Sequence, residues 1–208
     1  GRKFKYFLAL ILLIKEILNN KNLLVFSFQA NIYCIIVCKL FGVKVISRSN
    51  SAPIGWSQNW LKRTIFRIVL NLADKVMVNS LQFKKDLKKE FNVDAICIYN
   101  PLNIKEIKQK SKEKTQSIFK SKKKLKILNI GRFTEQKDQK TLLKSLNYLK
   151  RDLDYEAVLV GKGILKDNLI KYIKENDLKN KIKILNFVDN PYKLIKQTDI
   201  FILSSRFE

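Results

Sequence analysis

Short runs of β-branched residues alternate with amphipathic helical stretches along the whole chain, and this alternation constrains the fold more than any other feature of the sequence. The first half predicts strands over residues 23–28, 43–49, 75–79 and 95–99, separated by helices over 31–40, 59–73 and from Ser80 onward. The second half predicts strands over 125–130, 156–160, 182–187 and 199–203, separated by helices over 139–150, 164–177 and 190–197. Strands separated by helices of this length form right-handed βαβ crossovers, so both halves are expected to build parallel sheets.

Residues 102–124 interrupt this pattern. The segment is rich in Lys, Ser and Gln, its apolar periodicity fades, and it ends in three consecutive lysines. Such a change of composition favours a linker between two α/β lobes, one over residues 1–101 and one over 125–208. A Pro/Gly/Ser loop over 50–57, which contains Trp56, is expected within the first lobe.

The chain begins with basic residues and then an apolar run over residues 6–14, an arrangement similar to a signal peptide. No small-residue cleavage site follows, and the run is shorter than the roughly 20 apolar residues that span a bilayer. A buried or interfacial helix is therefore the preferred interpretation. The sequence starts without Met, so we expect that residues before Gly1 are missing.

The chain is strongly basic, with 42 Lys and Arg residues against 18 Asp and Glu, for a formal charge of +24. This charge favours anionic partners such as nucleic acid, acidic lipid or a phosphorylated substrate, although low-GC codon usage would also produce a lysine-rich chain. The sequence contains no His, which excludes Ser-His-Asp and Cys-His nucleophile schemes. Its three cysteines, Cys34, Cys38 and Cys97, match no zinc pattern and are interpreted as core thiols in a reducing cytoplasm.

Candidate binding residues follow the predicted strands of the second half, because ligands of open parallel sheets bind beyond the carboxyl ends of the strands. The strand over 125–130 runs into Gly131 and Arg132, and Lys137 follows just before a helix that Asp138 could cap. Glycine permits a tight turn there, and an Arg with a Lys suits the oxygens of a diphosphate. The same residue types are also common on any basic surface, so this pattern alone leaves both interpretations open.

Four segments of the second half, in this order, are similar to motifs of the family-four retaining glycosyltransferases. ILNIGRFTEQK over 127–137, with two leucines at 142 and 143, resembles the "GR…K…LL" signature, and VLVGKG over 158–163 resembles the "VGxG" element. FVDNPY over 187–192 resembles the "F…NPY" loop of capsule- and O-antigen-type members, and DIFILSSRFE over 199–208 resembles the start of the donor-site Glu-(seven residues)-Glu motif. The first lobe matches more loosely, through residues 73–80 and 98–101.

This resemblance implies an α/β fold of the GT-B type, with two Rossmann-like lobes whose parallel sheets face a cleft. It assigns catalytic roles to Arg132 and Lys137, which would bind the donor diphosphate, and to Glu208, which would hydrogen-bond the transferred sugar. Backbone around Val188 would meet the nucleobase, and Gly131 would allow close approach of the phosphates. The family uses no metal or other cofactor, because the Arg/Lys pair and helix amides neutralise the leaving diphosphate.

The chain also departs from the family pattern. The second Glu of the donor motif and the Gly-rich first strand are absent, so both lobes are expected to be incomplete and this fragment alone to have little or no transferase activity. Many family members have a cleft His where this chain has Arg48, which could contact donor or acceptor or point to solvent. Gly161 is a second candidate cleft residue, although a Gly-x-Gly after a strand is usually only a tight turn.

The function that the resemblance implies is transfer of a hexose or N-acetylhexosamine, with retention, from a nucleotide-diphosphate sugar to a glycan acceptor. We expect a UDP-sugar as donor, a glycan or lipid-linked glycan of a cell-surface polysaccharide as acceptor, and a cytoplasmic location, with peripheral contact to the acidic inner face of the membrane. One alternative is a basic nucleic-acid-binding protein, but the chain has no helix-turn-helix, ribonucleoprotein motif or zinc spacing, so no nucleic-acid partner is expected. A second alternative is another GT-B enzyme such as a nucleotide-sugar epimerase, against which the lack of His counts.

Overall fold

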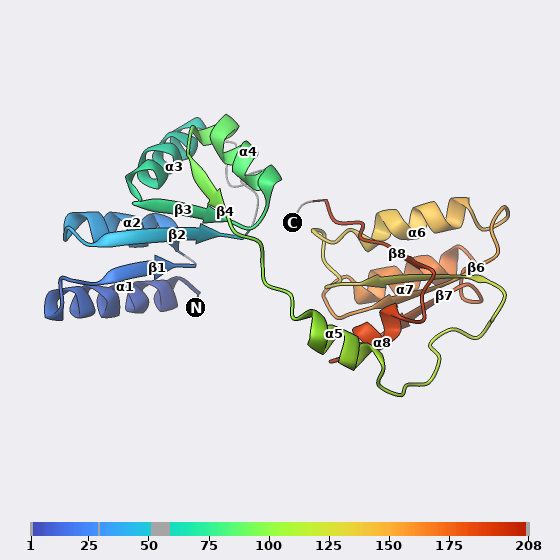
Figure 1. Cartoon of the computed structure of the whole chain (residues 1–208). Coiled ribbons are helices and arrows are strands. Elements are labelled where there is room, and N and C mark those ends of the chain that lie inside the picture. The colour runs from blue at the N-terminus through green and yellow to red at the C-terminus, as the bar shows by residue number, and fades with distance from the viewer. Residues whose placement is uncertain (1, 29, 51–58, 207–208) are drawn as a thin grey trace. The chain divides into compact units, whose positions relative to one another are not determined.

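The computed structural model describes residues 2–28, 30–50 and 59–206 and divides the chain into two compact units (Figure 1). Unit 1 is Gly1–Pro101 and unit 2 is Leu102–Glu208. Each unit is a parallel sheet with α-helices packed on it, as the alternation of the sequence predicts. The predicted loop around Trp56 and the candidate residue Glu208 lie outside the described residues.

Unit 1 has a four-stranded sheet in the order β1-β2-β3-β4, and every strand pair is parallel. Its elements, in chain order, are α1 (Arg2–Asn19), β1 (Leu24–Ser27), α2 (Asn31–Leu40), β2 (Lys44–Ser49), α3 (Trp60–Leu72), β3 (Lys75–Val78), α4 (Leu81–Phe91) and β4 (Ala95–Cys97). The predicted strands and helices of the first half are therefore confirmed, with ends that differ by a few residues.

Specific capping and turn residues start and end these helices. The side chain of Asn59 accepts hydrogen bonds from the first amides of α3, and the Ser80 hydroxyl accepts one from Phe83 N in α4. Helix α4 ends at Phe91 and is followed by its C-cap Asn92, which has a left-handed φ of 50°. After α2 the chain turns at Gly42, whose φ of 69° favours glycine.

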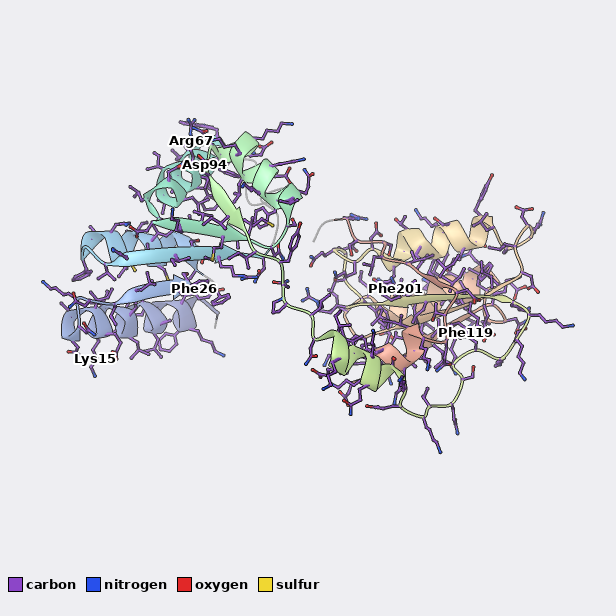
Figure 2. The ribbon with its side chains drawn as sticks, in the orientation of Figure 1. Lys15, Phe26, Arg67, Asp94, Phe119 and Phe201 are labelled. Atoms are coloured by element: carbon purple, nitrogen blue, oxygen red, sulfur yellow. The ribbon has the colours of Figure 1, made fainter. Side chains whose placement is uncertain are left out.

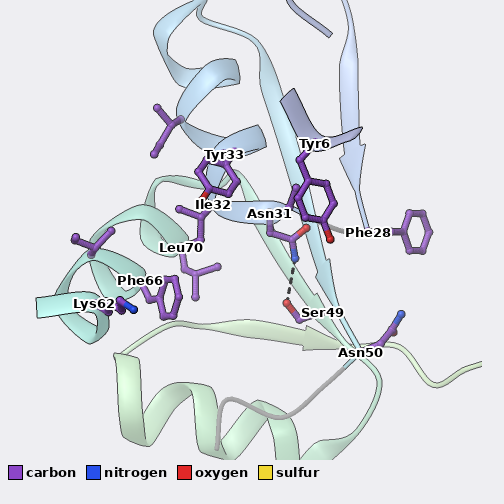
Figure 3. A pocket seen from close by; sticks show the side chains of 13 residues that line it. Tyr6, Phe28, Asn31, Ile32, Tyr33, Ser49, Asn50, Lys62, Phe66 and Leu70 are labelled. Carbon is purple, nitrogen blue, oxygen red and sulfur yellow. Dashed lines mark hydrogen bonds between the residues drawn. The ribbon is translucent and has the colours of Figure 1, made fainter. Parts of the chain in front are cut away.

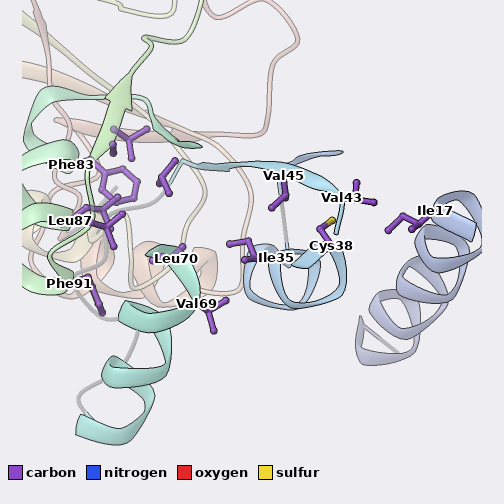
Figure 4. Packing of buried hydrophobic residues seen from close by; sticks show 14 residues of the cluster. Ile17, Ile35, Cys38, Val43, Val45, Val69, Leu70, Phe83, Leu87 and Phe91 are labelled. Atoms are coloured by element: carbon purple, nitrogen blue, oxygen red, sulfur yellow. The ribbon is translucent and has the colours of Figure 1, made fainter. Parts of the chain in front are cut away.

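The core of unit 1 lies where the helices pack on the sheet. Figure 4 shows Ile35 and Cys38 of α2 beside Val45 of β2, and all three are fully buried. Ile17 of α1 joins the same cluster. Burial raises the pKa of the Cys38 thiol to about 11, which agrees with the prediction of a core thiol.

Helix α1 confirms the predicted N-terminal helix. Although Ile17 is buried, Phe4 and Phe7 are each more than 60% exposed. Within the described residues, none of the helices has the length and apolar character needed to cross a membrane.

Unit 2 has a second parallel sheet, in the order β7-β6-β5-β8. Its elements are α5 (Ile104–Ser111), β5 (Leu125–Ile130), α6 (Gln139–Tyr148), β6 (Tyr155–Val160), α7 (Lys166–Glu175), β7 (Ile182–Leu185), α8 (Tyr192–Ile195) and β8 (Ile200–Phe201). Strands β6 and β5 form the middle of this sheet, and all six residues of β6 are buried. The order places the carboxyl ends of β5, β6 and β8 at one edge, where the candidate donor residues begin.

The prediction that residues 102–124 lack regular structure is wrong for part of the segment. Helix α5 forms within it, and Phe119 is buried against β5 and β6 in unit 2 (Figure 2). The largely buried Glu156 of β6 accepts hydrogen bonds from the backbone N–H groups of Lys120, at 2.8 and 2.9 Å, and of Ser121, at 3.0 Å. Contacts with residues distant in sequence therefore order this polar segment, and local periodicity does not reveal them.

Candidate functional site

The predicted diphosphate residues lie on the loop that joins β5 to α6, which we call the β5–α6 loop (residues 131–138). Backbone hydrogen bonds connect its first half to the end of β6: Gly131 N donates to Val160 O, and Phe133 N donates to Lys162 O, both at 3.0 Å. The Phe133 ring is fully buried beneath the loop. Packing of this ring and pairing with the neighbouring strand thus hold the position from which Arg132 projects.

Two glycines of the loop after β6 have a clear packing role. A Cβ at Gly161 would lie 1.9 Å from the Gly131 carbonyl oxygen, and a Cβ at Gly163 would lie 2.3 Å from the Phe133 carbonyl oxygen. Real Cβ atoms do not come this close to backbone, so contact between the two loops requires glycine at both positions. This accounts for Gly161 without a ligand, and a cleft role for it stays a prediction.

Gly131 differs from these two glycines. A Cβ there would meet only side-chain atoms, Gln139 Nε2 at 3.4 Å and Lys137 Cγ at 3.7 Å. The surrounding protein therefore does not itself demand glycine at this position. The prediction that Gly131 allows phosphates to approach remains a prediction, and it is compatible with this geometry.

Arg132 and Lys137 lie on different halves of the loop. The Arg132 side chain is exposed, and its guanidinium reaches Gln136 Oε1 at 3.4 Å. Its carbonyl oxygen accepts a hydrogen bond from the buried amide of Gln139 at 3.1 Å. Lys137 is half-buried and directly precedes Asp138, the N-cap of α6. The loop therefore brings two cations to the carboxyl end of β5, as the spacing predicts.

Asp138 performs the capping role predicted from the sequence. Its carboxylate accepts hydrogen bonds from Thr141 N at 3.3 Å and from the Thr141 hydroxyl at 2.9 Å, and its φ of 43° is left-handed. Arg206 Nε donates to the same carboxylate at 2.9 Å. This Arg206 contact, followed by the Thr141 bonds, holds the pKa of Asp138 below its usual value, and burial opposes the shift. The N-cap therefore stays ionised at neutral pH, with its charge balanced by Arg206.

The segment after β8 is hydrogen-bonded to the second half of the β5–α6 loop. Arg206 N donates to Gln136 O at 2.9 Å, and the Ser204 hydroxyl donates to Lys137 O at 2.9 Å. The sequence places Ser204 and Arg206 at the end of a predicted strand, in the stretch that resembles the donor motif, but it assigns no role to either residue. Their pairing with the loop depends on β8 lying beside β5, which the spacing of the motifs does not specify.

The loop after β7 carries the predicted nucleobase-contacting residue. Val188 is half-buried and packs against the cluster around Phe119, so only part of it faces solvent. Phe187 beside it is 59% exposed, and Lys162 Nζ lies 5.2 Å from the centre of its ring. Asn190 connects this loop to α5, because its side-chain amide donates to Lys110 O at 2.9 Å and to Glu113 Oε2 at 2.8 Å.

Arg48, the candidate cleft residue of unit 1, is engaged by neighbouring strand ends. Its guanidinium donates to Asn100 Oδ1 at 2.8 Å, to Ile98 O at 3.4 Å and to Asn50 Oδ1 at 3.3 Å. It also lies 5.9 Å from the centre of the Phe28 ring. Arg48 therefore connects the end of β2 to the residues after β4, and it does not simply point to solvent. A contact with donor or acceptor stays a prediction.

A hollow of about 890 Å³ opens beside the ends of β1 and β2 in unit 1 (Figure 3). Its walls are mostly aromatic and aliphatic and include Phe28, Tyr33 and Phe66. At its polar side, Asn31 Nδ2 donates to the Ser49 hydroxyl at 3.1 Å. A hollow of this size, with apolar walls and a few polar groups, has the character of a small-molecule site. Across the described residues, no group of three or more Cys, Asp or Glu side chains could hold a metal ion.

Comparisons with known proteins show what the chain is similar to. The sequence model of the glycosyl transferases group 1 family matches residues 110–208. An N-acetylgalactosamine-N,N'-diacetylbacillosaminyl-diphospho-undecaprenol 4-alpha-N-acetylgalactosaminyltransferase of Campylobacter jejuni is 29% identical over 186 residues, covering 85% of this chain and 49% of that protein. The chain therefore spans about half the length of this relative.

Two solved structures support the fold assignment. HepE of Anabaena, solved in complex with UDP, superposes with a TM-score of 0.69 at 16% identity, covering 94% of this chain and 56% of that chain. The lipopolysaccharide outer core galactosyltransferase WaaB, in its apo form, superposes with a TM-score of 0.68 at 16% identity, covering 94% of this chain and 54% of that chain. The two parallel α/β sheets thus match glycosyltransferases of the GT-B fold, which confirms the predicted fold class.

Proposed function

We propose, on the premise that residues 110–208 belong to the group 1 glycosyltransferases, that this chain is the sugar-transferring part of a bacterial glycan-synthesis enzyme. The donor is a nucleotide-diphosphate sugar, most simply a UDP-sugar carrying a hexose or N-acetylhexosamine. The acceptor is a glycan, free or lipid-linked, and the sugar is transferred with retention of its anomeric configuration. The product belongs to a capsule- or O-antigen-type surface polysaccharide, made on the cytoplasmic side.

The observation that carries this proposal is the pair of cations at the carboxyl end of β5. Arg132 is exposed and Lys137 half-buried, both on the β5–α6 loop inside the region that matches the family. The carboxylate of Asp138, which follows Lys137 on this loop, is paired with Arg206 at 2.9 Å, which reduces its repulsion of an incoming anion. A fork-shaped guanidinium and a compact ammonium suit the oxygens of a diphosphate leaving group, and no metal is needed.

The donor assignment also draws support from neighbours of the same fold. The HepE structures hold UDP in one case and UDP-glucose in another. In this chain Val188 would face the nucleobase and Glu208 would hold the transferred sugar. These roles rest on the sequence motifs.

The acceptor assignment draws support from unit 1. Its hollow of about 890 Å³ has largely apolar walls, which would suit the lipid-proximal part of an acceptor. The Campylobacter relative is named for an acceptor that carries undecaprenol diphosphate. A membrane-attached acceptor would bring the basic chain, with its formal charge of +24, close to acidic headgroups.

The donor proposal is tested by titrating the chain with UDP and with UDP-sugars in a calorimeter. Arg132→Ala and Lys137→Ala are each expected to weaken UDP binding by about 10- to 100-fold, the loss typical of a charge-assisted hydrogen bond. Arg151→Ala, a change of an exposed arginine in the turn after α6, is the control and should leave the affinity unchanged. Equal affinity of all three variants for UDP, or no UDP binding by the unchanged chain, would refute the proposal.

The transfer step is tested with the protein in its full natural length, since the chain spans about half of its Campylobacter relative. UDP-sugar is supplied together with a lipid-linked glycan, and the anomeric configuration of the product is read by NMR. An inverted product would contradict retention, while the donor assignment would stand. Vesicles that contain acidic lipid, sedimented over a series of salt concentrations, test the membrane proposal, which fails if no binding occurs at low ionic strength.

A further inference from the structure

We infer that Ser204 and Arg206 are positioning residues for the donor diphosphate, because they fix the outer half of the β5–α6 loop that carries Lys137. These two residues are called the clasp. The inference rests on the proposed function, in which this loop binds the diphosphate. It adds residues that have no assigned role and that act through the loop without touching the ligand.

The clasp makes three hydrogen bonds to three consecutive loop residues. Arg206 N donates to Gln136 O at 2.9 Å, the Ser204 hydroxyl donates to Lys137 O at 2.9 Å, and Arg206 Nε donates to the Asp138 carboxylate at 2.9 Å. A fourth, longer contact of 3.7 Å joins the Arg206 guanidinium to the Glu135 carboxylate. Every residue from 135 to 138 is thus contacted from the segment after β8.

The inner half of the loop has different supports. Phe133 N donates to Lys162 O, and Leu165 N donates to Phe133 O at 3.2 Å, so residues 131–133 are held from the loop after β6. Among the backbone hydrogen bonds of the described residues, the outer half otherwise depends on local turns, such as Lys137 N to Thr134 O at 3.1 Å. Such turn bonds shape the loop but do not connect it to the sheet. The clasp supplies that connection for Lys137.

The charge of Arg206 is a second way in which the clasp supports the proposed diphosphate site. Asp138 is the buried N-cap of α6 and is the residue directly after Lys137 in the chain. Unbalanced, this carboxylate would repel a diphosphate and would compete for the Lys137 ammonium. Arg206 satisfies the carboxylate from the side of β8, and removing it would therefore affect both geometry and charge. The Ser204 hydroxyl is neutral, so its removal affects geometry alone.

The experiment compares the UDP affinity of the 208-residue chain with that of Ser204→Ala and Arg206→Ala, by calorimetry and with melting curves of each variant. Ser204→Ala is expected to weaken UDP binding about fivefold, and Arg206→Ala about tenfold or more, since the first removes a neutral and the second a charge-assisted hydrogen bond. Ser145→Ala is the matched serine control, because its hydroxyl also donates to a backbone carbonyl, that of Thr141 at 3.1 Å. Arg151→Ala is the matched arginine control.

A double variant separates positioning from direct contact. In a Lys137→Ala background, Ser204→Ala is expected to cause no further loss, because the residue through which Ser204 acts no longer carries an ammonium. A persistent fivefold loss in that background would mean that Ser204 touches the ligand, and it would overturn the inference. A merely structural role would lower the melting temperature and leave the affinity of the folded chain unchanged, which would also overturn it.

The outcomes distinguish this inference from the proposal on which it rests. If the unchanged chain binds UDP and the Ser204 and Arg206 variants bind it equally well, the positioning role is refuted and the donor site stands. If the unchanged chain binds no UDP, the donor proposal fails and the positioning role falls with it.

Discussion

The contact between the loops after β5 and β6 gives a sharp test of how this site is built, through the change Gly161→Ala. The added Cβ would lie 1.9 Å from the Gly131 carbonyl oxygen, 3.0 Å from its carbonyl carbon and 3.3 Å from the Phe133 ring. This oxygen belongs to the backbone, so no side chain can rotate away to make room. One of the two loops must move by about 1 Å or more to restore a normal carbon–oxygen contact.

The cost of that movement follows from the bonds that hold the two loops. Gly161 N donates to Leu185 O at 3.1 Å, Gly131 N donates to Val160 O at 3.0 Å, and Phe133 N donates to Lys162 O at 3.0 Å. Weakening these bonds costs about 1 kcal/mol each. Displacing the fully buried Phe133 ring adds about 1–3 kcal/mol. The free energy of unfolding of unit 2 is therefore expected to fall by about 4–6 kcal/mol, a large part of the stability of an ordinary domain.

The assay is urea unfolding followed by two probes. Both tryptophans, Trp56 and Trp60, belong to unit 1, so tryptophan fluorescence follows unit 1 while far-ultraviolet circular dichroism follows both units. Gly161→Ala should lower the urea midpoint of the transition that only circular dichroism detects. Gly131→Ala is the matched control, because its Cβ would make ordinary contacts of 3.4 Å and longer.

The two glycine variants should differ in the unfolding free energy of unit 2, and UDP binding is a second measurement on the Gly131 variant. Gly131→Ala should keep the unfolding free energy of unit 2 within about 1 kcal/mol of the unchanged chain, yet weaken UDP binding if phosphates approach the backbone there. A stable Gly161→Ala chain would refute the reasoning from backbone contact. Equal destabilisation by both changes would refute the distinction drawn between the two glycines.

Three further changes probe the rest of the structure. Glu156→Gln places an NH₂ group against backbone N–H donors and should destabilise unit 2 by about 2 kcal/mol in urea unfolding, whereas Glu175→Gln on the exposed face of α7 should change little. Hydrogen bonds from the Lys39 ammonium and then from Val45 N lower the pKa of Asp74 in the folded chain. The ionised carboxylate therefore stabilises unit 1 at pH values above its unfolded pKa, and this stabilisation is lost as the pH falls through the lower folded pKa. The tryptophan-detected urea midpoint should therefore drop below about pH 4, and less steeply in Asp74→Asn; equal pH profiles would contradict this. Cys38, buried and with its pKa raised to about 11, should react with a thiol reagent only in urea, as mass spectrometry of the labelled peptide would show, and rapid native labelling would contradict its burial.

The sequence predicts most of the fold because the signals involved are local. A strand buried on both faces, such as β6, contains a continuous apolar run over residues 157–160, and helix starts such as Ser80 and Asp138 show their capping residue directly. Alternation of these signals then leaves parallel sheets as the consistent arrangement. For the same reason, the position of Arg132 and Lys137 just beyond the end of a strand follows from the sequence alone.

The parts that sequence reasoning missed depend on contacts between distant residues. Phe119 lies in a lysine-rich segment, and its burial depends on β5, β6 and α8 being assembled. In the sequence, Glu156 is a single charged residue in a predicted strand. Only the structure shows that its carboxylate accepts a hydrogen bond from the backbone N–H of Lys120. Arg206 belongs to the same group, because its partner Asp138 lies 68 positions earlier in the chain. Burial and pairing of this kind depend on strand order, which helix and strand periodicity do not encode.

The two cations of the proposed donor site are held by different neighbours of β5, and this has a consequence for how substitutions combine. Arg132 belongs to the half of the loop that pairs with the end of β6, while Lys137 belongs to the half that pairs with the segment after β8. Gly161→Ala should therefore disturb Arg132 first, and Ser204→Ala should disturb Lys137 first. Changes that act through separate supports add in free energy, whereas changes that act through one support do not. The fold-loss of UDP affinity in a Ser204→Ala, Arg132→Ala double variant should thus equal the product of the fold-losses of the two single variants. A smaller combined loss would mean that the loop moves as one rigid piece.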